Sequence, residues 1–389
     1  IEFLHMGVKI NDSNIIYLHN DVNNRYNQYY TEDTNILNTE IENTYFNLKI
    51  KQTDCAMINK DILIKKYTFE NNHSIDLKIN FLIHSKLMSS FNNMAGSLCT
   101  DDSLIQYAHN FTCVMVSKNK LLSHQLNDCE RNINSGVIND KDYIGMSPDA
   151  AISYDLGTLK PGEKTEISIL TFLTYDATNV NMIKEKIAEL KKINVNKEIT
   201  KIEEYWKKFV DKHDTFKLKP DGSDYMNKLI QTYKRTILYM PLITNEKTGA
   251  ISASVEVDEE RDNCGRYSYS WPRDVIMVYD GINYLNFDEY CKKYYEVFLK
   301  KAQDDTGMWE QRFYTDGTLA PCWGYQIDET AIVVWGAYQY YKQSTRKHGK
   351  KDINFLKENL KMIEKATAFL VKYINFVLEK EEKDDLVRI

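Results

Sequence analysis

The spacing of apolar residues changes once along the chain, from strand-like to helical, and this change limits the possible folds most. Up to about residue 178 the sequence is typical of strands: residues 62–69 are rich in β-branched and aromatic side chains, and residues 75–81 alternate apolar with polar. Turn clusters such as Lys160-Pro161-Gly162 separate the segments. An antiparallel β-sandwich is therefore predicted for the first half. Further strands are expected at residues 45–50, 112–116 and 166–170.

The second half shows the period of helices. Residues 180–193 and 198–212 are rich in Lys and Glu, which predicts a solvated helical connector. After a stop and cap at residues 219–223, apolar side chains recur along one face of the next predicted helix. That face comprises Met226, Leu229, Ile230, Tyr233, Ile237 and Leu238. Further helices are predicted over about residues 273–285, 287–302, 328–343 and 354–380.

Charge and composition exclude several classes of function. The 50 Lys and Arg against 56 Asp and Glu give a net charge of −6, which argues against a general nucleic-acid binder and suits a neutral substrate. No apolar run approaches the roughly 20 residues of a membrane span, and no signal peptide is visible, so a cytoplasmic protein without membrane contact is predicted. The seven cysteines form no C-x-x-C pair and the eight histidines no i, i+4 pair, so neither a metal nor a cofactor is predicted.

The first segment with a chemical signature covers residues 267–274, Tyr-Ser-Tyr-Ser-Trp-Pro-Arg-Asp. Helix capping explains Pro272 and Asp274, because proline and an acidic residue both favour a first helical turn. Capping does not explain the aromatic side chains just upstream. Arg273 only donates hydrogen bonds and Asp274 accepts them, so the pair is suited to gripping neighbouring hydroxyl groups.

The second segment runs over residues 307–317, Gly-Met-Trp-Glu-Gln-Arg-Phe-Tyr-Thr-Asp-Gly, and continues as Trp-Gly-Tyr-Gln-Ile-Asp-Glu-Thr-Ala over residues 323–331. Its aromatic, amide and carboxylate side chains stand where the next helix begins. Polar groups at successive helix entrances would converge at one end of a helical barrel. An aromatic-rich pocket with a few placed polar groups is expected there.

In combination these two segments resemble glycoside hydrolase family 15, the glucoamylase-like enzymes in their bacterial and archaeal form, and residues 145–149, Gly-Met-Ser-Pro-Asp, fit its sandwich domain. The resemblance implies a super-β-sandwich over residues 1–178, a helical linker over 179–221 and the first part of an (α/α)6 barrel over 222–389. It also implies exo-acting, inverting hydrolysis of α-glucosidic bonds at the non-reducing end of an α-glucan or α-glucoside.

The same resemblance implies a substrate-binding set on matching positions. Arg273 and Asp274 match the pair that holds hydroxyls of the terminal glucose, Trp323 matches an aromatic wall, and Tyr267 lines the cleavage subsite. The full set is Tyr267, Trp271, Arg273, Asp274, Trp323, Gln326 and Asp328.

No catalytic residue is predicted within this chain. The family's general acid lies in a later Trp-Glu-Glu segment and its base later still, so both are expected C-terminal to Ile389. Glu310, which follows Trp309, is interpreted as a loop or pocket-edge residue, and Glu329 as structural. The chain is thus predicted to be a fragment that does not hydrolyse glucosides at enzyme-like rates.

Two other functions remain open at this stage. A glycoside phosphorylase of similar architecture would use inorganic phosphate in place of the water-activating base. A non-catalytic carbohydrate-binding role is favoured by the expected absence of both catalytic carboxylates. The sequence predicts neither the linkage preference, among starch, isomaltose-type and trehalose-type substrates, nor the oligomeric state.

Overall fold

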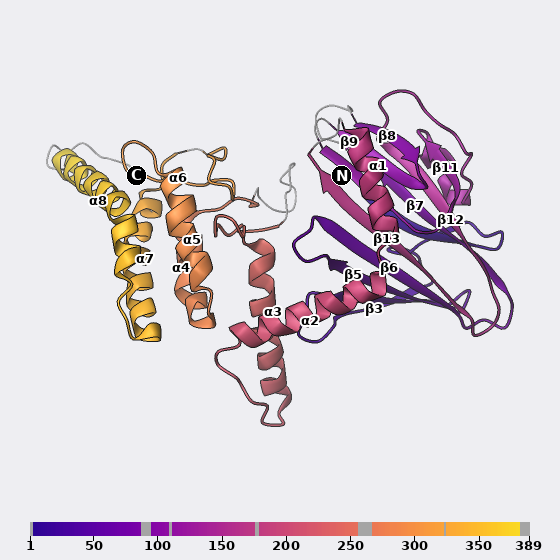
Figure 1. Cartoon of the computed structure of the whole chain (residues 1–389), viewed down its shortest axis with the longest axis horizontal. Helices are drawn as coiled ribbons and strands as arrows, with labels where there is room; N and C mark the ends of the chain where they lie inside the picture. The colour runs from indigo at the N-terminus through magenta and orange to yellow at the C-terminus, as the bar shows by residue number, and fades with distance from the viewer. Residues whose placement is uncertain are drawn as a thin grey trace. The chain divides into compact units, whose positions relative to one another are not determined.

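The structure, a computed structural model, describes residues 3–86, 95–108, 111–175, 179–255, 267–322 and 324–381 (Figure 1). It divides into two compact units, Ile1–Lys207 and Lys208–Ile389. The first unit contains the strands and the second is helical, as the change of sequence pattern predicted.

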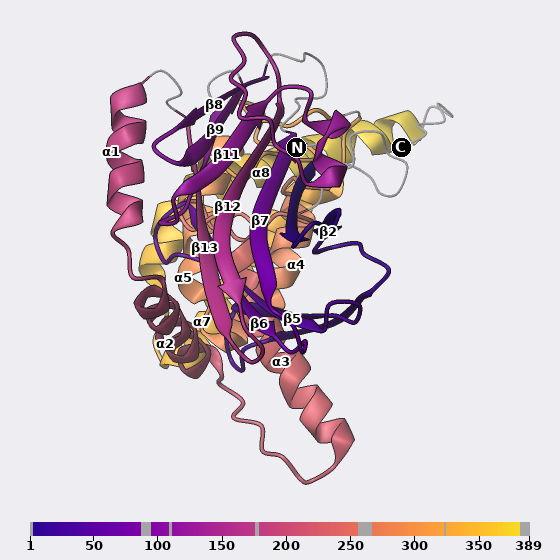
Figure 2. The same ribbon diagram turned by 90° about the vertical axis from the view of Figure 1, so that its right-hand side faces the viewer.

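The described part of the first unit contains two antiparallel sheets. β12 and β7 run side by side in the centre of the five-stranded sheet (Figure 2). Its strand order is β11 (Leu121–Leu126), β12 (Asp149–Leu159), β7 (Leu77–Lys86), β1 (Phe3–Ile10) and β2 (Ile15–Tyr17). The eight-stranded sheet has the order β3 (Asn24–Tyr30), β4 (Leu37–Asn43), β5 (Leu48–Ala56), β6 (Ile62–Asn71), β13 (Lys164–Thr174), β10 (Phe111–Val116), β9 (Ser103–Ala108) and β8 (Ala95–Thr100).

One hydrophobic core joins the two sheets, which makes the first unit a sandwich. Phe81 and Ile152 from the five-stranded sheet share it with Ile50 and Phe69 from the other. The alternation of buried and exposed side chains along these strands follows from the pleat, because successive residues point to opposite faces. The strand expected over residues 45–50 begins only at Leu48, because residues 44–47 form a turn.

Two helices follow the strands. α1 (Val180–Lys191) begins at Asn179, whose side chain accepts the Met182 N–H, and buries Ile183, Ile187 and Leu190 along one face. α2 (Val195–His213) crosses the division between the two units. The domain limits at 178 and 221 stay a prediction.

The second unit is built from helices joined by irregular segments. They are α3 (Asp224–Ile243), α4 (Pro272–Ile282), α5 (Asp288–Lys293), α6 (Lys300–Ala302), α7 (Ile327–His348) and α8 (Ile353–Glu381). Between α5 and α6 the chain keeps turning as a π-helix, η4 (Tyr294–Leu299). α7 lies beside both α4 and α8 (Figure 1).

The core of the second unit is aromatic. Tyr294, Phe298, Trp309 and Phe355 are all fully buried in it. The apolar face predicted for the helix from Met226 is only partly correct: Ile237 and Leu238 are buried, whereas Leu229 is exposed. Within the part of the chain that the structure describes, none of the helices combines the length and apolar character that a membrane span requires.

Candidate functional site

The Trp-Pro-Arg-Asp segment forms the entrance of α4. Trp271 precedes the helix in an extended conformation, and Pro272 occupies the first turn, where its fixed φ suits the helix and its missing N–H has no cost. Backbone hydrogen bonds between Ser270 and Phe313, in both directions, attach this entrance to the second signature segment. Arg273 and Asp274 therefore start on a rigid element rather than on a loop.

Arg273 brings the entrances of α4 and α7 together. Its Nη1 lies 2.7 Å from Asp328 Oδ2 and donates a longer hydrogen bond, of 3.4 Å, to Gln326 Oε1. Its Nη2 lies 3.6 Å from Asp274 Oδ2. The side chains of Arg273, Asp274 and Asp328 are 37%, 54% and 58% exposed, so these groups form an open polar surface. Polar groups thus meet at the entrances of two helices, α4 and α7. The convergence expected at successive entrances is seen for this pair, although α5 and α6 lie between the two helices in the chain.

Glu329 is buried under this polar surface and contacts both the backbone and the guanidinium of Arg273. One carboxylate oxygen accepts the Arg273 backbone N–H at 2.6 Å, and the other lies 3.2 Å from Nη1. The Glu329 side chain is fully buried, in contrast to its neighbour Asp328. The sequence interpretation of Glu329 as structural fits these contacts.

Burial and the mutual contacts of Arg273 and Glu329 shift the pKa values of both side chains. Partial burial alone would lower the pKa of Arg273, but the hydrogen bond to Asp328 and the charge of Glu329 outweigh it and raise that pKa. Burial raises the pKa of Glu329 from 4.5 to about 8, although the contacts with Arg273 oppose the rise. The carboxyl of Glu329 in the folded chain therefore loses its proton only around pH 8.

This shift predicts a dependence of stability on pH. Between about pH 4.5 and 8 the folded chain keeps a proton on Glu329 that the unfolded chain has released, so the free energy of unfolding should fall as the pH rises through this window. Glu329→Gln should flatten the fall, because the amide does not titrate. Urea unfolding at several pH values measures it. Glu364→Gln, at an exposed glutamate on α8, is the control and should keep the slope of the wild type. Equal slopes for wild type and Glu329→Gln would contradict the assignment.

Aromatic rings surround the entrance of α4. Tyr267 is 52% exposed, and its ring centroid lies 5.9 Å from that of Trp271, which is only 8% exposed. The buried Arg312 places its guanidinium 4.9 Å from the Tyr269 ring centroid and 5.6 Å from that of Trp271. Of the pair formed by Tyr267 and Trp271, Tyr267 is therefore the ring that solvent reaches, and Trp271 packs behind it.

The tryptophans of the second signature segment, Trp309 and Trp323, are not both described by the structure. Trp323 lies outside the described residues. Trp309 is fully buried, and its indole N–H donates to the Leu299 carbonyl, so its ring belongs to the core. Glu310, beside it in sequence, is half-buried. Substrate contact by any of the seven predicted residues stays a prediction.

The role of Arg312 was not predicted from the sequence, although this residue lies within the second signature segment. Its Nε donates to the Pro321 carbonyl at 2.6 Å, which fixes the guanidinium against the rings of Tyr269 and Trp271. The pairing of Arg312 with aromatic residues some 40 positions earlier has no local sequence signal.

Among the described residues, the one group of His, Cys, Asp or Glu side chains close enough to share a metal ion lies in the first unit, whereas Arg273 belongs to the second.

Comparison with known proteins identifies the fold. No model of a known protein family matches the chain, and a search of curated proteins finds no match. Among solved structures, a bacterial glucoamylase complexed with acarbose aligns with a TM-score of 0.57 and 13% identity, over 94% of this chain and 60% of that one. A putative kojibiose phosphorylase from the human microbiome aligns with a TM-score of 0.60 and 13% identity, over 94% of this chain and 48% of that one.

These likenesses concern the fold alone, because the sequence identity is low. The chain spans about 60% and about half of the lengths of the two proteins. It therefore shares with both, along nearly all of its own length, an antiparallel β-sandwich followed by a helical unit.

Proposed function

We propose that the chain is part of a glucoamylase-like, exo-acting glycoside hydrolase that releases glucose from the non-reducing ends of α-glucans or α-glucosides with inversion. In this proposal residues 1–178 are a super-β-sandwich, residues 179–221 a helical linker, and residues 222–389 the first part of an (α/α)6 barrel. The general acid and base belong to the part of the enzyme C-terminal to Ile389.

The observation that carries the proposal is the arrangement of Arg273 and Asp274. Asp328, Gln326 and Glu329 all engage Nη1, and this leaves Nη2 beside the Asp274 carboxylate. A donor and an acceptor thus stand next to each other on an open surface, as two neighbouring hydroxyls of a sugar require. The exposed ring of Tyr267 offers a flat apolar face nearby in sequence, of the kind that packs on sugar rings.

The geometry also supports placing the acid and base outside this set. Inverting hydrolysis needs two carboxyl groups about 6.5–9.5 Å apart on opposite sides of the scissile bond. Glu329 is buried under Arg273 and hydrogen-bonded to it, so it does not reach a glycosidic oxygen. The Asp328 carboxylate is paired with the Arg273 guanidinium and helps to hold it in position.

The test is the binding of acarbose to the 389-residue chain by titration calorimetry. Arg273→Ala should weaken binding by at least about tenfold, because hydrogen bonds to a charged group contribute about 1.5–3 kcal/mol. Arg346→Ala is the matched control: Arg346 is exposed near the far end of α7, about 27 Å along the helix from Asp328. Equal affinities for wild type and Arg273→Ala would overturn the assignment of Arg273, and steady glucose release from maltotriose by this chain would overturn the placement of the acid and base.

A glycoside phosphorylase is the second candidate, because the fold matches the kojibiose phosphorylase as well as the glucoamylase. Product formation by the whole enzyme that requires inorganic phosphate would favour it over the hydrolase. Binding of acarbose with no turnover by the whole protein, with or without phosphate, would favour a non-catalytic carbohydrate-binding role.

A further inference from the structure

Three potential metal ligands meet in the first unit, away from the core shared by the two sheets. His84 lies on β7, Asp149 begins β12, and Cys129 begins the short 3-10 helix η1 (Cys129–Arg131) that follows β11. On β7 the neighbours Ile83 and His84 point to opposite faces, and Ile83 belongs to the core between the sheets. All three residues are buried, and they come from three separate segments of the chain.

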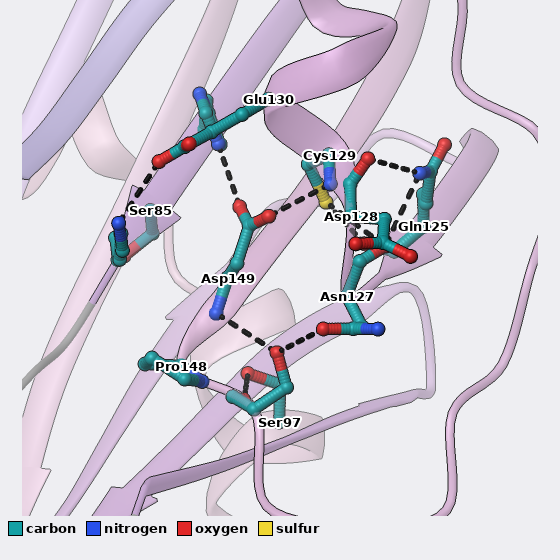
Figure 3. Close-up of polar contacts among 12 residues, drawn as sticks. Ser85, Ser97, Gln125, Asn127, Asp128, Cys129, Glu130, Pro148 and Asp149 are labelled. Atoms are coloured by element: carbon teal, nitrogen blue, oxygen red, sulfur yellow. Dashed lines mark hydrogen bonds and ion pairs between the residues drawn. The ribbon is translucent and has the colours of Figure 1, made fainter. Parts of the chain in front are cut away.

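The contacts among the three residues are short. Asp149 Oδ1 lies 2.8 Å from His84 Nε2, and Asp149 Oδ2 accepts the backbone N–H of Cys129 at 2.7 Å. Figure 3 shows Asp149 reaching toward Cys129, whose thiol donates to the Gln125 carbonyl at 3.2 Å. The ligating atoms of His84, Cys129 and Asp149 all lie within 4.8 Å of one another.

A second layer of hydrogen bonds holds Asp149 and the segment around Cys129 in place. The Asn127 N–H donates to the Asp149 carbonyl at 2.7 Å, and the Ser147 hydroxyl donates to Asn127 Oδ1 at 2.9 Å. Such outer contacts orient metal ligands and make a site rigid. The positions of the donors are therefore fixed by the fold.

The donor set suits a divalent transition metal. A nitrogen, a sulfur and an oxygen are the ligands that zinc prefers, at about 2.0–2.1 Å from nitrogen, 2.3 Å from sulfur and 2.0–2.2 Å from oxygen. Around a tetrahedral zinc ion two such ligand atoms lie about 3.3–3.6 Å apart. The ligand atoms here lie within 4.8 Å of one another, so side-chain movements of about 1 Å would close the site. A neutral imidazole, a thiolate and a carboxylate carry two negative charges, which balance the charge of the ion.

We propose that His84, Cys129 and Asp149 bind one divalent transition-metal ion of the zinc type, with water at a fourth position. On binding, the Cys129 thiol loses its proton to solvent, and so does His84 Nε2, which in the metal-free chain donates to Asp149 Oδ1. The imidazole then coordinates through Nε2 as the neutral ring with its proton on Nδ1. Burial and the nearby Asp149 carboxylate raise the pKa of this thiol, so the ion must displace a firmly held proton. The proposal is independent of the sugar chemistry proposed for the second unit.

The experiment is a titration of the full chain with Co²⁺ after removal of metals by a chelator. One equivalent should produce a thiolate-to-cobalt charge-transfer band in the near ultraviolet, and metal analysis of protein dialysed against Zn²⁺ should find one ion per chain. Cys129→Ser should abolish the band. Cys113→Ser is the control, because Cys113 is a buried cysteine on β10, in the other sheet, and should leave the band unchanged.

His84→Gln provides a second variant, in case Cys129→Ser does not fold. It should weaken Co²⁺ binding at least tenfold and cancel the rise in melting temperature that Zn²⁺ gives the wild type. The proposal is overturned if the wild type shows no band at one equivalent. It is also overturned if the band survives in Cys129→Ser, or if His84→Gln binds Co²⁺ as the wild type does.

Discussion

Replacing Trp309 with alanine should lower the free energy of unfolding by about 3–5 kcal/mol, the range typical of large aromatic side chains removed from a core. Trp309 is among the largest fully buried side chains and packs within the aromatic core of the second unit. Its backbone N–H donates to Thr330 Oγ1 and its indole N–H to the Leu299 carbonyl. The substitution would leave a cavity and remove one of the two donors to the Leu299 carbonyl, which keeps the Gln303 N–H.

The matched control is the next residue, Glu310. Its side chain is half-buried, and its Oε2 lies 4.0 Å from the Cys322 thiol, at the limit of a hydrogen bond to sulfur. Glu310→Ala should change the free energy of unfolding by about 0.5 kcal/mol or less. Urea unfolding followed by circular dichroism measures both variants.

The two variants also test how the Trp-Glu pair at residues 309 and 310 is interpreted. If the pair were a catalytic acid with its supporting ring, Glu310→Ala would abolish activity in the whole enzyme while leaving the fold intact. The core position of Trp309 indicates that the stability of the fold depends on the tryptophan. In the hydrolase proposed above, Glu310→Ala should then leave sugar turnover unchanged. A stable Trp309→Ala variant would contradict this interpretation.

Much of the fold could be predicted because local patterns report burial. The predicted helices at 328–343 and 354–380 correspond to α7 and α8, and the strand predicted at 62–69 lies within β6. Apolar residues recurring every three to four positions, or every two, mark one buried face, and this signal does not depend on distant contacts. The entrance of α4 at Pro272 was predictable for the same local reason.

What could not be predicted depends on contacts between distant segments. Asp328 and Glu329 are adjacent acids with the same local signal, yet one is exposed and the other buried under Arg273, because neighbouring residues on a helix point about 100° apart. His84 and Asp149 are 65 positions apart and meet only because β7 pairs with β12. The three proposed metal ligands are far apart in the sequence, so the absence of closely spaced histidines or cysteines, from which no metal was predicted, does not exclude a site of this kind.

The glycine at position 249 should be the least replaceable in the second unit's core. Gly249 has a φ of +72°, and a Cβ there would lie 2.2 Å from the Tyr290 carbonyl oxygen and 2.7 Å from the Tyr294 nitrogen. Both atoms belong to helix backbone, at the junction of α5 with η4, so the clash cannot be relieved by turning a side chain. The Tyr279 hydroxyl donates to the Gly249 carbonyl, which ties the same loop to α4.

Gly249→Ala should therefore cost about 2–5 kcal/mol, the sum of about 1–2 kcal/mol for the left-handed conformation and about 1–3 kcal/mol for overpacking. Gly222→Ala separates the two contributions, because Gly222 has a φ of +87° and no atom within 4 Å of the added Cβ. It should cost only the conformational part. Urea midpoints for the two variants measure the difference. Equal midpoints would mean that the loop carrying Gly249 moves away from α5 at little cost, and that its close packing against the Tyr290 and Tyr294 backbone is not required for stability.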